Sequence, residues 1–127
     1  MPYKITDVED GGVITTFFGI VTDEDIIESA REKCFSPQKL ASYRYAITVC
    51  VDVEKFDVSA QGMIDNAAIS KKAFFMNKNL LLVGVYPDDL GYGMGRLWQG
   101  YADDIGWSTK VVRSMDEAKK WLKKNLQ

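Results

Sequence analysis

The chain has 127 residues, of which 46% are hydrophobic and 27% are charged, and its formal net charge is −2. This length and these hydrophobic and charged fractions predict one domain over residues 1–127 with a core of its own. The chain has no excess of basic residues that would indicate a nucleic-acid partner. The sequence has no histidine and two cysteines, which excludes Ser-His-Asp and Cys-His catalysis and the usual tetrahedral zinc site.

The chain begins with Met1-Pro2-Tyr3-Lys4, which lacks the apolar region of a secretory signal. No apolar run approaches the length of about 18 residues that spans a membrane. Cys34 and Cys50 fall in apolar stretches, and without a secretory context we expect reduced, buried thiols rather than a disulfide. These features predict a cytoplasmic protein that does not span a membrane.

Two strands are predicted first, over Lys4–Thr6 and Val13–Ile20. They flank Glu9-Asp10-Gly11-Gly12, and Asp-Gly or Gly-Gly between β-rich runs is a hairpin signal. A helix is then predicted from about Asp23 to Phe35, because apolar residues recur there at helical spacing. The segment Gln38–Arg44 is amphipathic but short, and we expect it to be irregular.

The central stretch, Ala46–Val51, is an apolar run rich in β-branched residues, which is typical of a strand covered on both faces. We expect a polar loop from Asp52 to Asp57, and then a helix from about Ala60 into the seventies. Leu80–Val85 is a second apolar run of the same kind. The two runs are predicted to form adjacent, parallel, central strands.

The stretch Tyr86–Gly95 is expected to be the longest irregular segment, and it ends in Gly91-Tyr92-Gly93-Met94-Gly95. This GxGxG pattern is neither a dinucleotide fingerprint nor a P-loop, and the two aspartates before it repel phosphate. We therefore expect a surface loop whose glycines need positive φ and no cofactor. A helix from about Arg96 to Ile105 follows, and Gly106 ends it.

The last elements are a short strand over Thr109–Val112 and a helix that Ser114 and Glu117 open as a capping box. The predicted order is β-β-α-β-α-β-α-β-α. This alternation predicts an α/β fold with a mostly parallel sheet, right-handed crossovers and an N-terminal antiparallel hairpin.

Three passages of the chain resemble the STAS superfamily, the fold of the SpoIIAA-like anti-sigma-factor antagonists: Gly19–Thr22, Asp57–Ile64 and Val111–Leu122. The third is similar to small bacterial proteins described as SpoIIAA-like or STAS/SEC14-like. The resemblance implies a non-enzymatic regulatory or protein-interaction module. The alternative that it implies is a carrier or sensor of a small apolar ligand.

The antagonists carry an acid, two hydroxyl residues and a glycine where a loop enters a helix, and the second hydroxyl is phosphorylated. By resemblance, Asp57 takes the place of the acid and Ser59 that of the phosphorylated residue, whereas Val58 replaces the first hydroxyl and Ala60 the glycine. Asp57 and Ser59 are also preferred helix N-caps. We therefore predict that Ser59 caps the helix and is not a working phosphoserine switch.

Six residues form the candidate surface for a protein partner or a small apolar ligand: Asp57, Ser59, Tyr86, Tyr92, Arg96 and Trp98. A flat exposed surface around Asp57 and Ser59 would favour a protein partner. A closed apolar cavity near Tyr92 and Trp98 would favour a ligand, although Trp98 also fits the buried stripe of its helix. We also predict a weak or moderate homodimer that uses exposed aromatics of the Tyr86–Trp98 region.

Overall fold

A five-stranded sheet is the centre of the computed structural model, which describes residues 2–126. Its strands, in the spatial order β1-β2-β3-β4-β5, are β1 (Tyr3–Val8), β2 (Gly12–Thr22), β3 (Tyr45–Asp57), β4 (Leu81–Val85) and β5 (Ser108–Val112). β1 is antiparallel to β2, and the other neighbouring pairs are parallel. The α/β class, the N-terminal hairpin and the adjacent parallel runs at Ala46–Val51 and Leu80–Val85 are thus confirmed.

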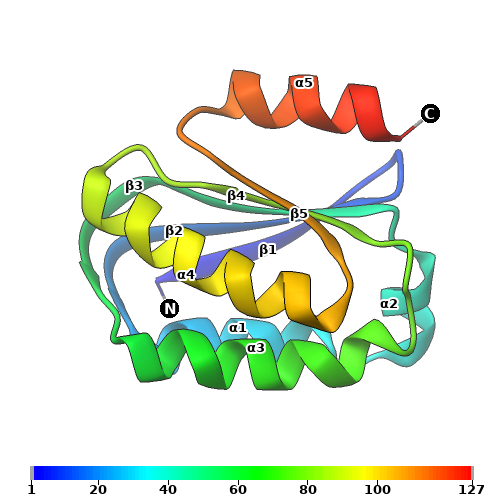
Figure 1. Ribbon diagram of the computed structural model, residues 1–127, viewed down its shortest axis with the longest axis horizontal. Coiled ribbons are helices and arrows are strands. Elements are labelled where there is room, and N and C mark those ends of the chain that lie inside the picture. Colours follow the sequence, from blue (N-terminus) through cyan, green and yellow to red (C-terminus); the bar gives the residue numbers. More distant parts are fainter. Residues whose placement is uncertain (1, 127) are drawn as a thin grey trace.

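Five helices cover the two faces of this sheet (Figure 1). They are α1 (Asp23–Lys33), α2 (Pro37–Ser42), α3 (Ala60–Phe74), α4 (Asp89–Ile105) and α5 (Met115–Asn125). Helices α1, α3 and α4 lie on one face, and α5 lies alone on the other. The face with three helices is called the α1/α3/α4 face below.

The central strand β3 is buried on both sides because its side chains alternate between two cores. Ile47 and Val49 belong to the core under α5. Ala46 and Cys50 pack on the side of α1, α3 and α4. The sheet therefore separates an apolar layer under α5 from a second layer on the α1/α3/α4 face.

Predicted turns and caps account for the ends of several elements. Gly11 has φ 92° and donates its N–H to the Val8 carbonyl at 3.1 Å, which closes the hairpin. The backbone N–H of Thr22 donates to the Asp25 carboxylate at 2.8 Å at the start of α1. Ser114 accepts from the Glu117 N–H at 3.3 Å at the start of α5. The expected Ser114–Glu117 pair is thus present at α5, and Thr22 and Asp25 form a similar pair at α1.

Two segments expected to be irregular are regular. Gln38–Arg44 lies mostly in α2, which Ser36 opens by accepting the Lys39 N–H at 3.3 Å. The expected loop Asp52–Asp57 continues β3, because residues 18–22 of β2 pair with it. The polar side chains of this segment suggested a loop, and that expectation is wrong. The end of a strand can extend beyond the helices that cover the sheet and leave polar side chains in solvent.

The largest correction concerns Tyr86–Gly95, since α4 begins at Asp89 within that stretch. Asp88 caps the helix by accepting the Gly91 N–H at 2.8 Å. The structure places positive φ among its glycines only at Gly11, Gly19 and Gly106, within residues 2–126. The glycine run is therefore helical, and the expected surface loop with positive φ is wrong.

Tyr86 explains why glycines occupy this helix. A Cβ added at Gly95 would come within 2.6 Å of the Tyr86 ring, and one added at Gly84 within 2.5 Å. Gly91 would approach the same ring at 3.4 Å. Two helical glycines four residues apart and one strand glycine thus make room for the ring, so α4 can lie close to the sheet although glycine is a poor helix former.

Candidate functional site: a cavity under helices α1, α3 and α4

A cavity of about 90 Å³ lies in the layer between the sheet and the α1/α3/α4 face. Small side chains on both of its walls leave this space. On the sheet side they are Ala46, Thr48 and Gly84, and on the helix side Ala30 and Ser70. Larger apolar side chains close the rest, so the cavity is mostly apolar.

Lys33, in the last turn of α1, is the only charged residue among those that line the cavity, all of which lie within residues 2–126. Within this range the structure gives its amine no ion pair and no hydrogen bond. Burial lowers the pKa of the Lys33 amine, while the neighbouring Cys34 and Cys50 act in the opposite direction. Burial without a counter-ion favours the neutral form of an amine, and among residues 2–126 no ion pair involves Lys33.

Most other polar groups in the cavity wall already have protein partners, and the Thr48 and Tyr86 hydroxyls are the exceptions among the described residues. Asn66 donates to the Ile26 carbonyl at 3.0 Å and accepts from the Trp98 indole N–H at 2.8 Å. The Ser29 hydroxyl donates to the same Ile26 carbonyl at 2.9 Å, and the Ser70 hydroxyl to the Asn66 carbonyl at 3.1 Å. These bonds tie α1, α3 and α4 together, and they leave those groups satisfied without a ligand.

The Tyr86 hydroxyl is a further cavity group without a hydrogen-bond partner among the described residues. Burial, and to a smaller degree the nearby Cys50, raises the pKa of Tyr86 far above its ordinary value. Cys50 also acts on the pKa of Lys33. Lys33, Tyr86 and Cys50 all line this cavity, and the first two each have a hydrogen-bond donor to offer.

Both donors retain some accessible surface. Across residues 2–126, no fully buried side-chain nitrogen or oxygen is without a hydrogen-bond partner. Because the Lys33 amine and the Tyr86 hydroxyl have none, each atom must retain surface that a water-sized probe can touch. For Lys33 this agrees with an accessible area that is intermediate rather than zero.

The two cysteines of the cavity are poor nucleophiles. Burial raises the pKa of the Cys50 thiol to about 12, and it also raises the pKa of Cys34. A thiolate is the reactive form of cysteine, and both residues are protonated near neutral pH. The site can bind and orient a molecule, but its thiols are not activated.

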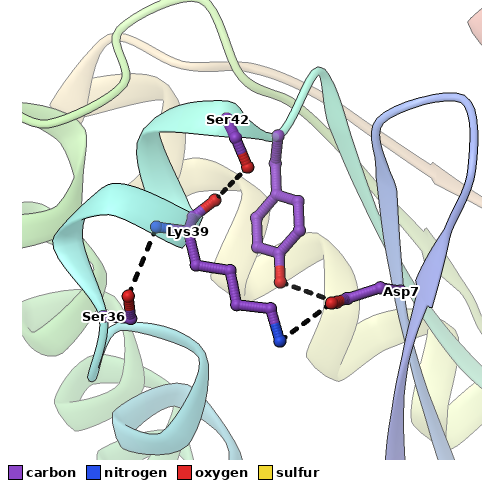
Figure 2. Close-up of polar contacts among 5 residues, drawn as sticks. Asp7, Ser36, Lys39 and Ser42 are labelled. Carbon is purple, nitrogen blue, oxygen red and sulfur yellow. Dashed lines mark hydrogen bonds and ion pairs between the residues drawn. The ribbon is translucent and has the colours of Figure 1, made fainter.

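Helix α2 closes one end of the cavity with Leu40, and Tyr43 follows it in the wall. Figure 2 shows how polar contacts hold this segment against β1. The Asp7 carboxylate accepts from the Tyr43 hydroxyl at 2.7 Å and pairs with the Lys39 ammonium at 2.8 Å. The contact with Lys39, and to a smaller degree the bond from Tyr43, lowers the pKa of Asp7. Burial, and then the bond to Asp7, raises the pKa of Tyr43.

The structure does not bring the six predicted site residues together. Tyr86 and Trp98 line the cavity. Tyr92 lies outside it, half-buried against the same core, with the Arg113 guanidinium 4.3 Å from its ring centre. Arg96 is exposed on α4. Because Tyr86 is buried and both Tyr92 and Trp98 are half-buried, the expected set of exposed aromatics for a homodimer is wrong.

Asp57 and Ser59 lie together at the entrance of α3, away from the cavity lining. Asp57 is the exposed last residue of β3. Ser59 is the N-cap of α3 and accepts the Gly62 N–H at 3.1 Å, which confirms the predicted cap. Its hydroxyl also donates to the Asp23 carboxylate at 2.6 Å, so it is held by bonds within the protein.

Sequence reasoning missed Lys33 and Asn66. A signal for Lys33 was present, since Ile26, Ala30 and Lys33 stand at i, i+4 and i+7, the spacing of one helix face. A lysine in the buried stripe of a helix indicates either a snorkelling side chain or a functional amine. Asn66 gave no signal, because its role depends on Trp98, which is 32 residues away.

Within residues 2–126, no group of three His, Cys, Asp or Glu residues lies close enough to hold a metal ion. In the same range, no helix has both the length and the apolar character needed to cross a membrane. Comparison of the chain with protein-family models, with curated proteins and with solved structures gives no match.

Proposed function

We propose that this protein binds a small, largely apolar ligand in the cavity on its α1/α3/α4 face, and that it acts as a carrier or sensor without chemistry of its own. The observation that carries the proposal is the cavity itself, because an apolar hollow with a few polar groups is the usual form of a ligand site. The protonated thiols and the absence of histidine from the sequence support binding rather than catalysis.

The proposal fits the STAS/SEC14-like side of the resemblance. An antiparallel hairpin followed by parallel strands, most of them joined through a helix, is the order of elements that this resemblance implies. The antagonist side has less support, since the hydroxyl of Ser59 is already bound to Asp23. We therefore treat ligand binding as the primary function of a STAS-like domain.

The size of the cavity limits the ligand. A cavity of about 150 Å³ holds benzene, and a water takes up about 30 Å³. A hollow of about 90 Å³ therefore suits roughly four non-hydrogen atoms, or one end of a longer chain. Short alcohols and short carboxylates are suitable probes.

The test is a titration of isotope-labelled protein with 1-butanol and butyrate, followed by amide and side-chain NMR shifts. We expect saturable shifts that cluster on cavity residues such as Trp98 and Trp107. Ala30→Leu adds three carbon atoms inside the cavity and should weaken binding at least tenfold. Ala68→Leu makes the same change on the exposed face of α3 and should leave binding unchanged.

Native mass spectrometry of the purified protein complements the titration, since it reports a retained ligand and the oligomeric state together. If neither probe binds at tens of millimolar, or if Ala30→Leu and Ala68→Leu behave alike, the proposed function is wrong. If both probes bind and only the cavity variant weakens them, the proposal holds.

A second candidate, a protein-interaction module, is favoured by an apolar patch on the sheet. Helix α5 packs over β3, β4 and β5, whereas Phe18 and Ile20 of β2 and Val51 of β3 remain 43%, 57% and 46% exposed. Exposed apolar side chains that cluster in this way often mark contact surfaces. Sedimentation of the wild type and of Ile20→Lys would test it, and a monomer at high micromolar concentration in both would exclude a homodimer through this patch.

A further inference from the structure

We infer that the cavity selects short apolar ligands that carry one anionic group, and that Lys33 and Tyr86 in the cavity wall hold that group. This inference rests on the ligand-binding function proposed above and names its ligand class. Short-chain carboxylates are the simplest members of the class. The argument starts from the charge balance of the cavity wall.

Lys33 is the one charged side chain in the lining, and no carboxylate of residues 2–126 lies within ion-pair distance of its amine. Burying an ammonium without a partner is costly, so burial favours the neutral amine and lowers the pKa of Lys33. A neutral apolar ligand would deepen this cost by displacing any water at the amine. An anionic ligand instead supplies the missing counter-charge, and charge-assisted hydrogen bonds are the stronger kind.

Tyr86 adds a second donor of fixed position. Its ring is held between Gly84, Gly91 and Gly95, and its hydroxyl has no acceptor among the residues that the structure describes. A carboxylate has two oxygens and can accept from an ammonium and a phenol together. Two free donors in the wall of one cavity whose lining has no carboxylate form a site for an acceptor.

The rest of the wall specifies the other end of the ligand. Asn66, Ser29 and Ser70 use their polar atoms in bonds within the protein. Apart from the Thr48 hydroxyl, the remaining surface is aliphatic, aromatic or thiol. A molecule that matches both parts is therefore apolar over most of its length and anionic at one end.

The experiment compares butyrate with 1-butanol, which has the same carbon chain and no charge, by NMR titration at constant pH and ionic strength. We expect butyrate to bind the wild type at least tenfold more tightly than 1-butanol. In Lys33→Met, which keeps a chain of similar length without the charge, the preference should disappear while 1-butanol still binds. Lys72→Met, at an exposed lysine of α3, should retain the wild-type preference.

Tyr86→Phe provides a second variant that keeps the ring between its glycines, and it should reduce the preference for butyrate without removing it. Equal affinity of the wild type for both probes would overturn the inference and leave the proposed function intact. A preference that survives in both Lys33→Met and Tyr86→Phe would also overturn it. Failure of both probes to bind the wild type would overturn the inference and the proposed function together.

Discussion

The Asp23 carboxylate of α1 accepts both the backbone N–H and the hydroxyl of Ser59, at 2.7 and 2.6 Å. The same hydroxyl oxygen accepts the Gly62 N–H at 3.1 Å, so Ser59 connects the first turn of α3 to the first turn of α1. The position that resembles a phosphoacceptor is thus next to an internal carboxylate. A phosphate there would be repelled by Asp23 as well as by Asp57.

The first prediction concerns this contact. Ser59→Ala should cost about 0.5–2 kcal/mol of the free energy of unfolding, as the loss of an N-cap does. Ser59→Asp should cost more than Ser59→Ala, because it brings a second carboxylate to Asp23, and Asp23→Asn should recover part of that loss. Urea unfolding of the single and double variants measures these differences.

Ser36→Asp is the matched control, since Ser36 caps α2 and has Lys39 rather than an acid beside it. Aspartate is about as good an N-cap as serine, so this change should be nearly neutral. A Ser59→Asp variant as stable as the wild type would show that the Asp23 contact is not formed in solution. A phosphopeptide containing Ser59 from native cells would restore the antagonist function.

The second prediction separates two glycines of α4. Replacing glycine by alanine inside a helix normally stabilises it by about 0.5–1 kcal/mol. Gly100 has nothing within 4 Å of an added Cβ, so Gly100→Ala should show this gain. Gly95→Ala should instead destabilise the protein by about 1–3 kcal/mol, because its Cβ meets the Tyr86 ring.

The Gly95→Ala effect should depend on the ring. In a Tyr86→Ala background the steric conflict is gone, and Gly95→Ala should become neutral or stabilising. Thermal unfolding of the four proteins in this cycle measures the coupling. Equal effects of Gly95→Ala and Gly100→Ala in the wild type would mean that α4 does not approach the sheet as closely as described.

The third prediction concerns thiol reactivity. Because burial raises the pKa of both thiols and Cys50 is more deeply buried than Cys34, native-state labelling should be slow and Cys50 should react last. Mass spectrometry of the Cys34→Ala and Cys50→Ala variants during reaction with a thiol reagent gives the labelling rate of the one cysteine that remains in each. Rapid labelling of Cys50 without denaturant would contradict its position in the wall of the cavity.

The fourth prediction concerns alkaline pH. The Cys50 thiol has a pKa of about 12 in the folded protein against an ordinary 9.0, and burial also raises that of Tyr45 to about 12. The unfolded chain therefore loses these protons first, so the stability that Cys50 and Tyr45 contribute is full below pH 9 and falls as the pH rises toward 12. Each such group contributes a slope of at most about 1.4 kcal/mol per pH unit.

Cys50→Ala removes one titrating group, so its unfolding free energy should fall less steeply between pH 9 and 11 than that of the wild type. Urea unfolding at several pH values in this range gives the two slopes. Parallel profiles for the two proteins would show that Cys50 does not titrate differently in the folded and unfolded states.

The sequence predicted those elements whose signals are local. The apolar runs at Ala46–Val51 and Leu80–Val85, the hairpin at Gly11 and the cap at Ser59 each depend on a few neighbouring residues. The start of α4 could not be predicted in this way, because its glycines are explained by a ring that precedes the helix. Tertiary packing there outweighs a poor helix propensity.

The candidate site was predicted only in part for the same reason. Tyr86 and Trp98 were named from their place near one strand end, and both line the cavity. The hollow arises from small residues on four separate elements, and no short window of sequence contains it. Lys33 becomes notable only when the wall around it is known to lack an acid.

The glycine contacts of Tyr86 have a mechanical consequence. Gly91 and Gly95 have no side chains that could reorient, so a ligand that displaces the ring must move the backbone of α4 instead. That helix carries Arg96 and Leu90 on the surface of the protein. A ligand that displaces the ring is therefore expected to shift surface residues of α4, and amide hydrogen exchange along α4 with and without butyrate would record this shift.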